Sequence, residues 1–355
     1  MKNINFGTRQ IGDGHPTFIT YEAGPTHDGL ESAKELITLA AEAGADAIKF
    51  QILDPDRLVA DRKMPFEYKI LVDRETGKTE TIQEPLYDIL CRRALSFDEW
   101  RECKAHADDH NLAFFATVGF EDEIDLLAEL GCDSIKIASG DVTHTPLIRR
   151  AARTGMCLQL DTGNSTIGEI ESAVDVIRSE GNENIIIHHC PSGYPAHKDG
   201  INLRVIQTLK QMFDYPIAFS DHSPGWEMDI AAIALGANLI EKTITRDRTT
   251  PSVEHIMSIE PPYLNEFIEV IRSIELALGT KRRLMSAEET EKRLSVHRSI
   301  YISEDTPAGT RLADAPLEFR RPGDGLLPNM IEVIGDAKLC TDLPAGHKLT
   351  MADLD

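Results

Sequence analysis

The chain has 355 residues, with 59 acidic against 37 basic side chains and a formal net charge of −22, which argues against binding to nucleic acid or to an anionic membrane surface. Hydrophobic residues make up 41% of the chain, enough for a sizeable core, and this excludes wholesale disorder. No apolar run approaches the ~20 residues of a membrane span, and the first residues lack the apolar segment of a signal peptide. The six cysteines are scattered without a C-x-x-C pair. We therefore expect a protein of the reducing cytoplasm, without disulfides or a structural zinc site.

Eight short apolar runs alternate with amphipathic stretches, and each run is predicted to be a strand: 18–22, 47–51, 113–117, 134–137, 157–160, 184–188, 217–220 and 239–243. Helical patterns between them cover 30–43, 97–110, 121–130, 166–179 and 226–235. Two of these helices begin with capping boxes, Ser96 with Glu99 and Thr166 with Glu169. Eight strand–helix units over about 260 residues predict an α/β fold of the (β/α)8 TIM-barrel type. A doubly wound open sheet is the alternative.

A short internal repeat favours the barrel, because segments 44–49, 131–136 and 236–241 share one sequence pattern. In each, a helix ends at glycine, turns through Asp or Asn, and enters a strand that carries a charge near its carboxyl end. These charges belong to Lys49, Lys136 and Glu241. The carboxyl ends of barrel strands form the catalytic face, and a buried charge there needs a ligand or a partner. The three residues are therefore candidates either for the site or for a structural ion pair.

The chain changes character after the predicted barrel, which we place at 1–280. Residues 281–297 are strongly charged and predict a linker or a solvated helix. Short strand-like runs at 298–302, 317–320 and 338–341 alternate with Pro/Gly turns, so 298–355 is predicted to be a small β-rich domain. Within the barrel, 54–85 is too long for an ordinary loop and is expected to be an insertion at the active site.

A cation, a hydroxyl and a glycine turn follow the fourth predicted strand, at Lys136, Ser139 and Gly140. Phosphate accepts hydrogen bonds from all of these groups, including the backbone N–H groups of a helix start. Thr117 and the segment 162–164, at the exits of neighbouring strands, could add donors. Together these residues predict an anion site.

The histidines supply a second set of candidates. His188 and His189 are adjacent in a strand and must face opposite sides, so one is expected in the core and the other in the site. His222 follows the seventh strand as a candidate metal ligand or acid–base group, and Asp221 could orient it.

Two carboxylate–imidazole pairs complete the candidates. Glu22 ends the first strand close to His27, in a loop that either caps the next helix or handles substrate. Glu254 and His255 follow the eighth strand.

Several of these motifs, in this order, resemble the sialic acid synthase family, which includes N-acetylneuraminate, legionaminate and pseudaminate synthases. The resemblance covers nearly the whole chain and rests on Glu22-x-Gly-x-x-His27-x-Gly29, Lys49-x-Gln51, Lys136-x-x-Ser139-Gly140, His189-Cys190-x-Ser192-x-Tyr194, Ser220-Asp221-His222, Glu241-Lys242 and Arg321-Pro322-Gly323-Asp324-Gly325. It implies a metal-dependent TIM barrel followed by a small antifreeze-like (SAF) domain. It also implies a homodimer in which the SAF domain of one subunit closes the barrel of the other.

The resemblance further implies that phosphoenolpyruvate condenses with an N-acylated hexosamine or related aldose to give a nonulosonic acid, a 2-keto-3-deoxy sugar acid, with release of phosphate. By motif, the residues that bind phosphoenolpyruvate would be Thr117, Lys136, Ser139, Ser192 and Ser220, and Lys49 and Asp161 are further substrate-binding candidates. Those that meet the sugar would be Glu22, Gln51, Tyr194 and Glu254, with Arg321 reaching in from the partner subunit. Asp141 stands at the catalytic carboxylate position, one methylene shorter than the family's Glu.

The resemblance implies a divalent metal, Mn²⁺ or Mg²⁺, with His222 as one ligand. Thr243 stands where the family has its second metal histidine. Since catalytic sites usually supply about three protein ligands, we expect weak or absent metal binding, with His222 partly a hydrogen-bond donor to the aldehyde oxygen. Asp161 and Glu254 also depart from the family pattern, and a different acceptor is therefore expected.

Two other functions stay open from the sequence. One is a barrel aldolase or lyase of 2-keto acids that forms a Schiff base through Lys49 or Lys136. The other is a non-catalytic sugar-binding homologue.

Overall fold

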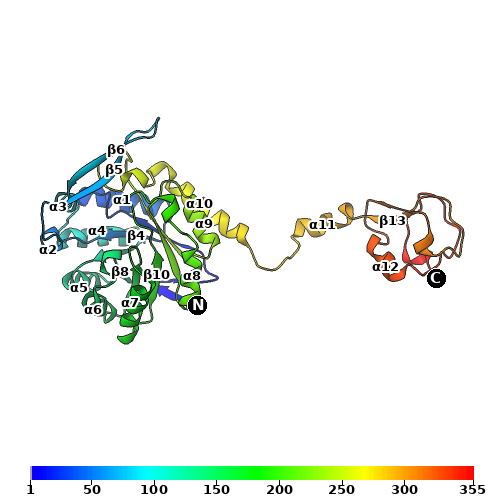
Figure 1. The fold of residues 1–355 in the computed structure, drawn as a ribbon, viewed down its shortest axis with the longest axis horizontal. Coiled ribbons are helices and arrows are strands. Elements are labelled where there is room, and N and C mark those ends of the chain that lie inside the picture. The colour runs from blue at the N-terminus through cyan, green and yellow to red at the C-terminus, as the bar shows by residue number, and fades with distance from the viewer. Residues whose placement is uncertain (1) are drawn as a thin grey trace. The chain divides into compact units, whose positions relative to one another are not determined.

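The computed structural model describes residues 2–355, which divide into two compact units. The first ends at Gly279 and the second is Thr280–Asp355 (Figure 1). No helix in these described residues is long and apolar enough to cross a membrane.

Eight parallel strands close into a barrel, in the order β10-β11-β12-β3-β4-β7-β8-β9. They are β3 (Phe18–Glu22), β4 (Ala47–Gln51), β7 (Ala113–Val118), β8 (Ser134–Ile137), β9 (Cys157–Asp161), β10 (Ile185–His189), β11 (Ile217–Asp221) and β12 (Leu239–Thr243). The last strand, β12, pairs with the first, β3, in register Leu239↔Phe18. The predicted TIM barrel is thus confirmed and the open doubly wound sheet is wrong.

Helices cover the outside of the barrel: α1 (Leu30–Glu42), α4 (Phe97–Asp109), α5 (Glu121–Glu129), α6 (Thr145–Ala152), α7 (Ile167–Ser179), α8 (Val205–Met212), α9 (Glu227–Ala234) and α10 (Pro261–Leu278). The five predicted helices agree with these bounds to within one residue at each end. Both expected capping boxes are present, so the hydroxyl and carboxylate of each box satisfy backbone N–H groups at the helix start.

The barrel interior changes from apolar to charged along the strands. At the amino-terminal end, Ile186, Ala218 and Leu239 belong to one apolar cluster. Two residues further along the same strands stand His188, Ser220 and Glu241, all buried. This alternation has period 2, so each triplet faces the interior and the polar one lies toward the carboxyl ends.

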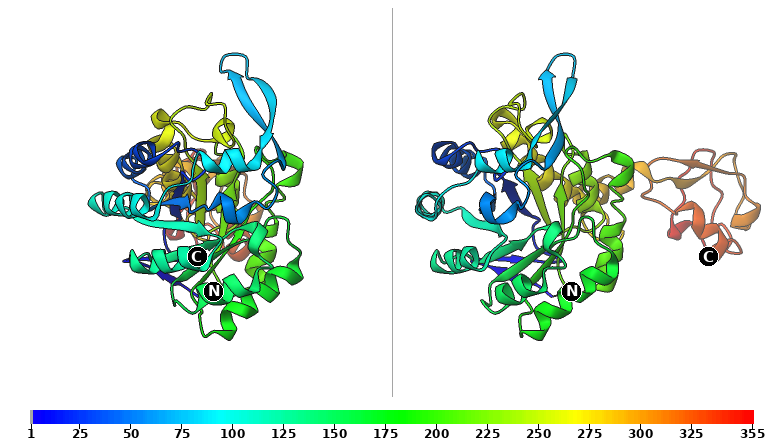
Figure 2. Two further views of the ribbon diagram at one scale, coloured as in Figure 1. Left: turned by 90° about the vertical axis from the view of Figure 1, so that its left-hand side faces the viewer. Right: turned by 60° about the vertical axis from the view of Figure 1, so that its left-hand side comes forward.

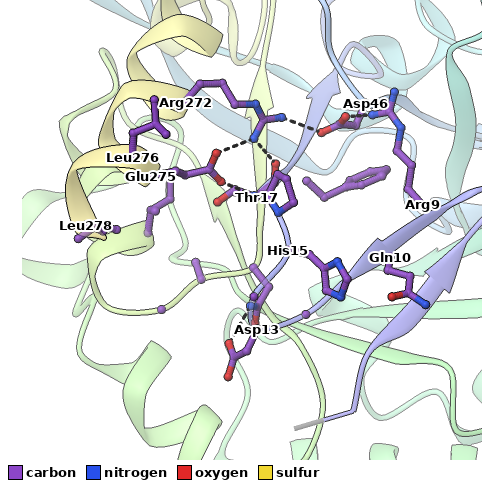
Figure 3. A pocket seen from close by; sticks show the side chains of 18 of the residues that line it. Arg9, Gln10, Asp13, His15, Thr17, Asp46, Arg272, Glu275, Leu276 and Leu278 are labelled. Atoms are coloured by element: carbon purple, nitrogen blue, oxygen red, sulfur yellow. Dashed lines mark hydrogen bonds and ion pairs between the residues drawn. The ribbon is translucent and has the colours of Figure 1, made fainter. Parts of the chain in front are cut away.

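A short hairpin of β1 (Ile4–Phe6) and β2 (Arg9–Ile11) adds Ile4, Phe6 and Ile11 to the apolar end of the barrel. Beside it lies an open hollow of about 1030 Å³ (Figure 3). There the Arg272 guanidinium donates to the Thr17 carbonyl (2.7 Å) and contacts Asp46 (3.3 Å). Its charges are paired with one another, and the hollow lies at the end of the barrel away from the catalytic face.

The predicted insertion after β4 forms α2 (Pro55–Leu58), a hairpin of β5 (Pro65–Asp73) and β6 (Lys78–Pro85), and α3 (Leu86–Cys91). The hairpin projects from the barrel (Figure 2). At its turn, Arg74 binds Glu260 (2.7 Å) and Asp247 (2.6 Å), and near its base Tyr68 packs in a small core with Val253. The insertion is therefore fastened to the loop that follows β12.

The second unit contains α11 (Ala287–Val296), an antiparallel pair of β13 (Ser299–Ile302) and β14 (Leu317–Arg320), and α12 (Ile331–Ile334). The 3₁₀ turns Leu312–Asp314, Pro328–Met330 and Met351–Asp353 complete it. Its own core includes Ile300, Ile302 and Leu349. The strand expected at 338–341 forms only isolated bridges, at Lys338 and Leu339.

Candidate active site

A cavity of about 400 Å³ opens at the carboxyl ends of the barrel strands, within the size range of small-molecule sites. Most of the residues singled out in the sequence line it: Glu22, Lys49, Gln51, Thr117, Ser139, Asp141, Asp161, Tyr194, His222 and Glu254. They come from eight separate stretches of chain, which the closed barrel brings to one place.

Charged and polar side chains at the floor form what we call the strand-end network: Lys49, Lys136, Asp161, Ser220 and Glu241. Glu241 is shared, with Oε1 2.8 Å from the Lys49 Nζ and Oε2 2.5 Å from the Lys136 Nζ. Lys49 also pairs with Glu22, and Lys136 pairs with Asp161 at 3.0 Å and donates to the Ser220 hydroxyl at 3.0 Å. The charged strand positions are thus partners of one another.

The network fixes the ionisation of its members. Burial alone would lower the pKa of Lys49, but Glu22 and Glu241 together raise it well above its usual range. Burial would raise the pKa of Glu241, but Lys136 and Lys49 together hold it well below its usual range. For Glu22, burial raises the pKa in spite of the neighbouring Lys49. Lys49 and Glu241 are therefore ionised at neutral pH.

Lys136 and Ser220 lie below the cavity rather than on its wall. Lys136 is completely buried, and its Nζ is occupied by Glu241, Asp161 and Ser220. Asp161 lines the cavity above it. A ligand anion in the cavity would compete with the Asp161 carboxylate for Lys136.

The two adjacent histidines of β10 face opposite ways, as their strand positions predict. The His188 ring binds Ser220 through Nδ1 (3.0 Å) and Gln159 through Nε2 (2.8 Å), inside the barrel. Burial, with the charge of Lys136, lowers the pKa of His188 to about 3, so this ring is neutral. His189 donates from Nε2 to the Ile201 carbonyl at 2.6 Å and packs against Phe219. His188 thus supports the strand-end network and His189 belongs to the core.

His222 lines the cavity and is neutral, because burial lowers its pKa. Its Nδ1 lies 3.1 Å from the Pro191 carbonyl, so Nδ1 carries the proton and donates it. The remaining Nε2 can only accept a hydrogen bond, and the expectation that His222 donates to an aldehyde oxygen is wrong for this neutral ring. Asp221 does not orient His222, because it binds Lys242 and Ser223 instead.

The side chains around His222 do not fit a divalent metal. No group of three or more His, Cys, Asp or Glu side chains in residues 2–355 could hold an ion together. Thr243 occupies the second family position with a neutral hydroxyl, and His255 binds the Thr245 hydroxyl at 2.7 Å. A catalytic metal needs about three protein ligands, which this donor set does not supply.

Loop residues Tyr194, His222 and Glu254 also line the cavity. Arg93 is buried within electrostatic range of Glu254 and Tyr194, and we call these four residues the loop side. The Tyr194 and His222 rings lie 4.8 Å apart. Glu254 has a φ of 71°, a left-handed conformation that costs energy in a residue with a side chain and is typical of functional sites. Burial, reinforced by the charge of Glu22, raises the pKa of Glu254 to about 8.

Sequence reasoning missed Arg93, which follows α3 in the insertion. Its neighbour Arg92 has the same side chain, and only the fold makes one buried and the other exposed. His27 was a candidate, but its ring packs between Phe50 and Trp100 with neither nitrogen hydrogen-bonded. It is a core residue, and burial lowers its pKa to about 4.

Two predicted site residues lie elsewhere. Ser192 is exposed and donates to the Asn164 side chain (2.9 Å), which itself lines the cavity. Arg321 belongs to the second unit, so its role at a barrel stays a prediction.

A closed barrel with a charged cavity at the carboxyl ends of its strands defines a TIM-barrel enzyme. The chain matches the model of the NeuB family over residues 36–283 and belongs to that family. It is 33% identical to the N,N'-diacetyllegionaminic acid synthase of Legionella pneumophila, over 98% of this chain and 97% of the relative. It is 31% identical to the human N-acetylneuraminate-9-phosphate synthase, over 86% and 83% of the two chains.

A solved structure agrees. The N-acetylneuraminic acid synthetase of Leptospira borgpetersenii, in complex with citrate, superimposes with a TM-score of 0.71 at 32% identity, covering 82% of this chain and 95% of the other. The chain is therefore an enzyme of the sialic acid synthase kind, a transferase that makes sugar acids by condensation.

Proposed function

We propose that this enzyme condenses phosphoenolpyruvate with an N-acylated hexosamine or a related aldose to give a nonulosonic acid and inorganic phosphate. The observation that carries the proposal is the strand-end network, two buried lysines beneath a cavity of about 400 Å³ whose wall also holds Gln51, Thr117 and Ser139. Carbon 3 of the enol attacks the open-chain aldehyde, water adds at carbon 2, and the tetrahedral intermediate expels phosphate.

The anionic substrate fits the network side of the cavity. Lys49 reaches the wall and carries a positive charge, while Thr117 and Ser139 offer hydroxyl groups. Charge-assisted hydrogen bonds to phosphate and carboxylate are stronger than neutral ones. Once the phosphate displaces Asp161, Lys136 adds a second cation.

The sugar lies on the loop side. Burial raises the pKa of the Tyr194 phenol, so its O–H stays protonated and can donate to the aldehyde oxygen. The neutral His222 accepts a hydroxyl of the sugar through Nε2. Glu22 and Asp141 face the cavity as carboxylates that move protons at carbon 2 and at the aldehyde.

The Schiff-base alternative requires a lysine that loses its proton near neutral pH. The pKa of Lys49 is raised well above its usual range by Glu22 and Glu241, which keeps this amine protonated. The ion pairs of Lys136 likewise occupy its Nζ. The condensing reaction fits the lysines better.

The test is consumption of phosphoenolpyruvate with a panel of N-acylated hexosamines and simple aldoses, with phosphate measured and the product identified by mass. Release of phosphate in step with one new sugar acid is the expected result. Labelling by borohydride with pyruvate would instead show a Schiff-base enzyme. Binding of sugars without turnover under any condition would show a non-catalytic homologue.

We also propose a homodimer whose second unit is an SAF domain that serves the neighbouring barrel through Arg321. The resemblance and the charged segment 281–297 support this. Mixing Arg321→Ala with a Lys49→Met barrel should restore activity in heterodimers, since each mixed dimer keeps one intact site. Absence of rescue in verified heterodimers would show a tail that acts within its own subunit.

A further inference from the structure

Arg93 is a buried cation without a partner. It follows α3, whose Leu86 and Leu90 line the active-site cavity, and it is only 6% exposed. Its Nε is fully buried with no hydrogen bond, and among residues 2–355 the guanidinium has neither a hydrogen bond nor an ion pair. Its electrostatic neighbours include Glu254, Glu22 and Tyr194, and all three lie on the cavity wall.

Burying an unpaired cation costs folding free energy. Burial lowers the pKa of Arg93, but an arginine remains ionised in proteins, so the charge persists. Buried charges are normally paired, because burying an unpaired ion costs far more than burying a neutral group.

The neighbouring carboxyl groups do not compensate it. Glu254 has a pKa of about 8 and is largely neutral at pH 7. Glu22 is within ion-pair distance of Lys49 instead. Positive charge on the loop side is therefore left over, while every lysine of the strand-end network is matched.

We infer that Arg93 binds an anionic group of the acceptor, so that the second substrate is an aldose carrying a phosphate ester or a carboxylate away from its aldehyde. The inference rests on the proposed function for the reaction itself. The guanidinium is suited to both groups, since its planar fork matches their paired oxygens. The neutral Glu254 carboxyl beside it can donate to the same anion or to a sugar hydroxyl.

The test compares matched acceptors: N-acetylmannosamine, its 6-phosphate, and the uronic acid of the same sugar. Consumption of phosphoenolpyruvate gives kcat/KM for each. With the wild-type enzyme, the 6-phosphate or the uronic acid should exceed the neutral sugar by about 30-fold, and whichever leads identifies the anion. In Arg93→Met the preference for the anionic acceptor over the neutral one should fall to about twofold or less. Arg92→Met is the control, because Arg92 is exposed and pairs with Glu84 at 2.6 Å.

Stability separates binding from a structural role. Arg93→Met removes an unpaired buried charge, so the ligand-free variant should unfold at the same temperature as wild type or higher. The 6-phosphate should raise the unfolding temperature of wild type but not of Arg93→Met. Arg93→Lys keeps the positive charge but loses the planar guanidinium, so it should retain part of the preference for the anionic acceptor.

Equal kcat/KM for neutral and anionic acceptors in wild type would overturn the inference, as would a loss of folding in Arg93→Met with full folding in Arg92→Met. If no acceptor consumes phosphoenolpyruvate, the proposed reaction fails. Calorimetric titration with the 6-phosphate, which needs no turnover, then still tests Arg93.

Discussion

The two sides of the cavity differ in how far the protein satisfies its own polar groups. In the strand-end network, Lys136 alone has three partners within 3.0 Å, and Glu241 uses both oxygens. On the loop side, Arg93 has none and Glu254 sits on a left-handed backbone. The strand-end network pairs its charges within the protein, whereas the loop side keeps a buried guanidinium without a hydrogen bond or ion pair.

The difference follows from the scaffold. Neighbouring barrel strands hold their side chains in fixed register, as at Ser220↔Glu241 and Thr117↔Lys136, so charges there can be matched in advance. Loops tolerate changes in sequence more readily and carry specificity. The strand-end network should therefore determine whether an anion binds, and the loop side which acceptor is used.

Replacing Lys136 by Met should lower kcat/KM more than Asp141→Asn or Asp161→Ser, because it breaks the strand-end network. Two carboxylates, Asp161 and Glu241, then lose a cation beneath the anion site. The loss of a buried cation–anion contact costs about 2–4 kcal/mol, so kcat/KM for phosphoenolpyruvate should fall by a factor of about 30 to 1000. Steady-state kinetics measure it.

The matched control is Lys104→Met, which breaks an ion pair with Asp108 on the outer helix α4. If the Lys136→Met variant folds as judged by circular dichroism and binds phosphoenolpyruvate like wild type, the phosphate site lies elsewhere.

Asp141→Asn tests the carboxylate that follows β8. Asp141 is half-buried, 3.6 Å from the His144 Nδ1, and burial raises its pKa. A base with a raised pKa loses its active, charged form at a higher pH than an ordinary aspartate as the pH falls. The acid limb of the kcat profile should therefore lie above the usual aspartate range, and Asp141→Asn should remove that limb and lower kcat about 100-fold. An unchanged limb in the variant would assign it to another group.

Asp161→Ser should improve the binding of phosphoenolpyruvate, so it tests the strand-end network by a gain of affinity instead of a loss. The Asp161 carboxylate covers Lys136 and faces the entering phosphate. Replacing it by a hydroxyl removes a repulsion and frees one Nζ donor, so KM for phosphoenolpyruvate should fall about tenfold. KM for the acceptor should stay within about twofold, since the loop side is untouched. A weaker affinity for phosphoenolpyruvate would mean that Asp161 contributes a needed proton or contact.

Sequence patterns predicted the barrel and the strand-end network because both depend on local periodicity. Strand exits in a closed barrel converge on one face, so placing Glu22, Lys49 and Lys136 at such exits was enough to bring them together in one chain of ion pairs. The sequence could not tell that the lysines are already matched, because pairing depends on side-chain directions across strands.

On the loop side, sequence reasoning named Tyr194, His222 and Glu254 but missed Arg93 and the contacts that the loops make. Arg93 comes within electrostatic range of Glu254 through an insertion that is held by long-range contacts such as Arg74 with Glu260, 186 residues away. The partner of His222 is the Pro191 carbonyl, a backbone group with no sequence signature, whereas the adjacent Asp221 turned to Lys242. Loop geometry of this kind is set by tertiary contacts and not by local pattern.

Removing divalent metal should change the rate of condensation least of all these treatments. The cavity offers one neutral imidazole, His222, with Thr243 in the position where a second imidazole is expected, and a hydroxyl is a weak ligand for Mn²⁺-like ions. Condensation with the preferred acceptor should therefore keep its rate within about twofold in excess EDTA. Thr243→His supplies the absent imidazole, and this variant should bind Mn²⁺ measurably more tightly than wild type in equilibrium dialysis. A stoichiometric metal that survives purification of the wild-type enzyme, with turnover lost in EDTA and restored by Mn²⁺, would show that the loop side is completed by an ion. Arg93 and Tyr194 would then no longer suffice to hold the acceptor.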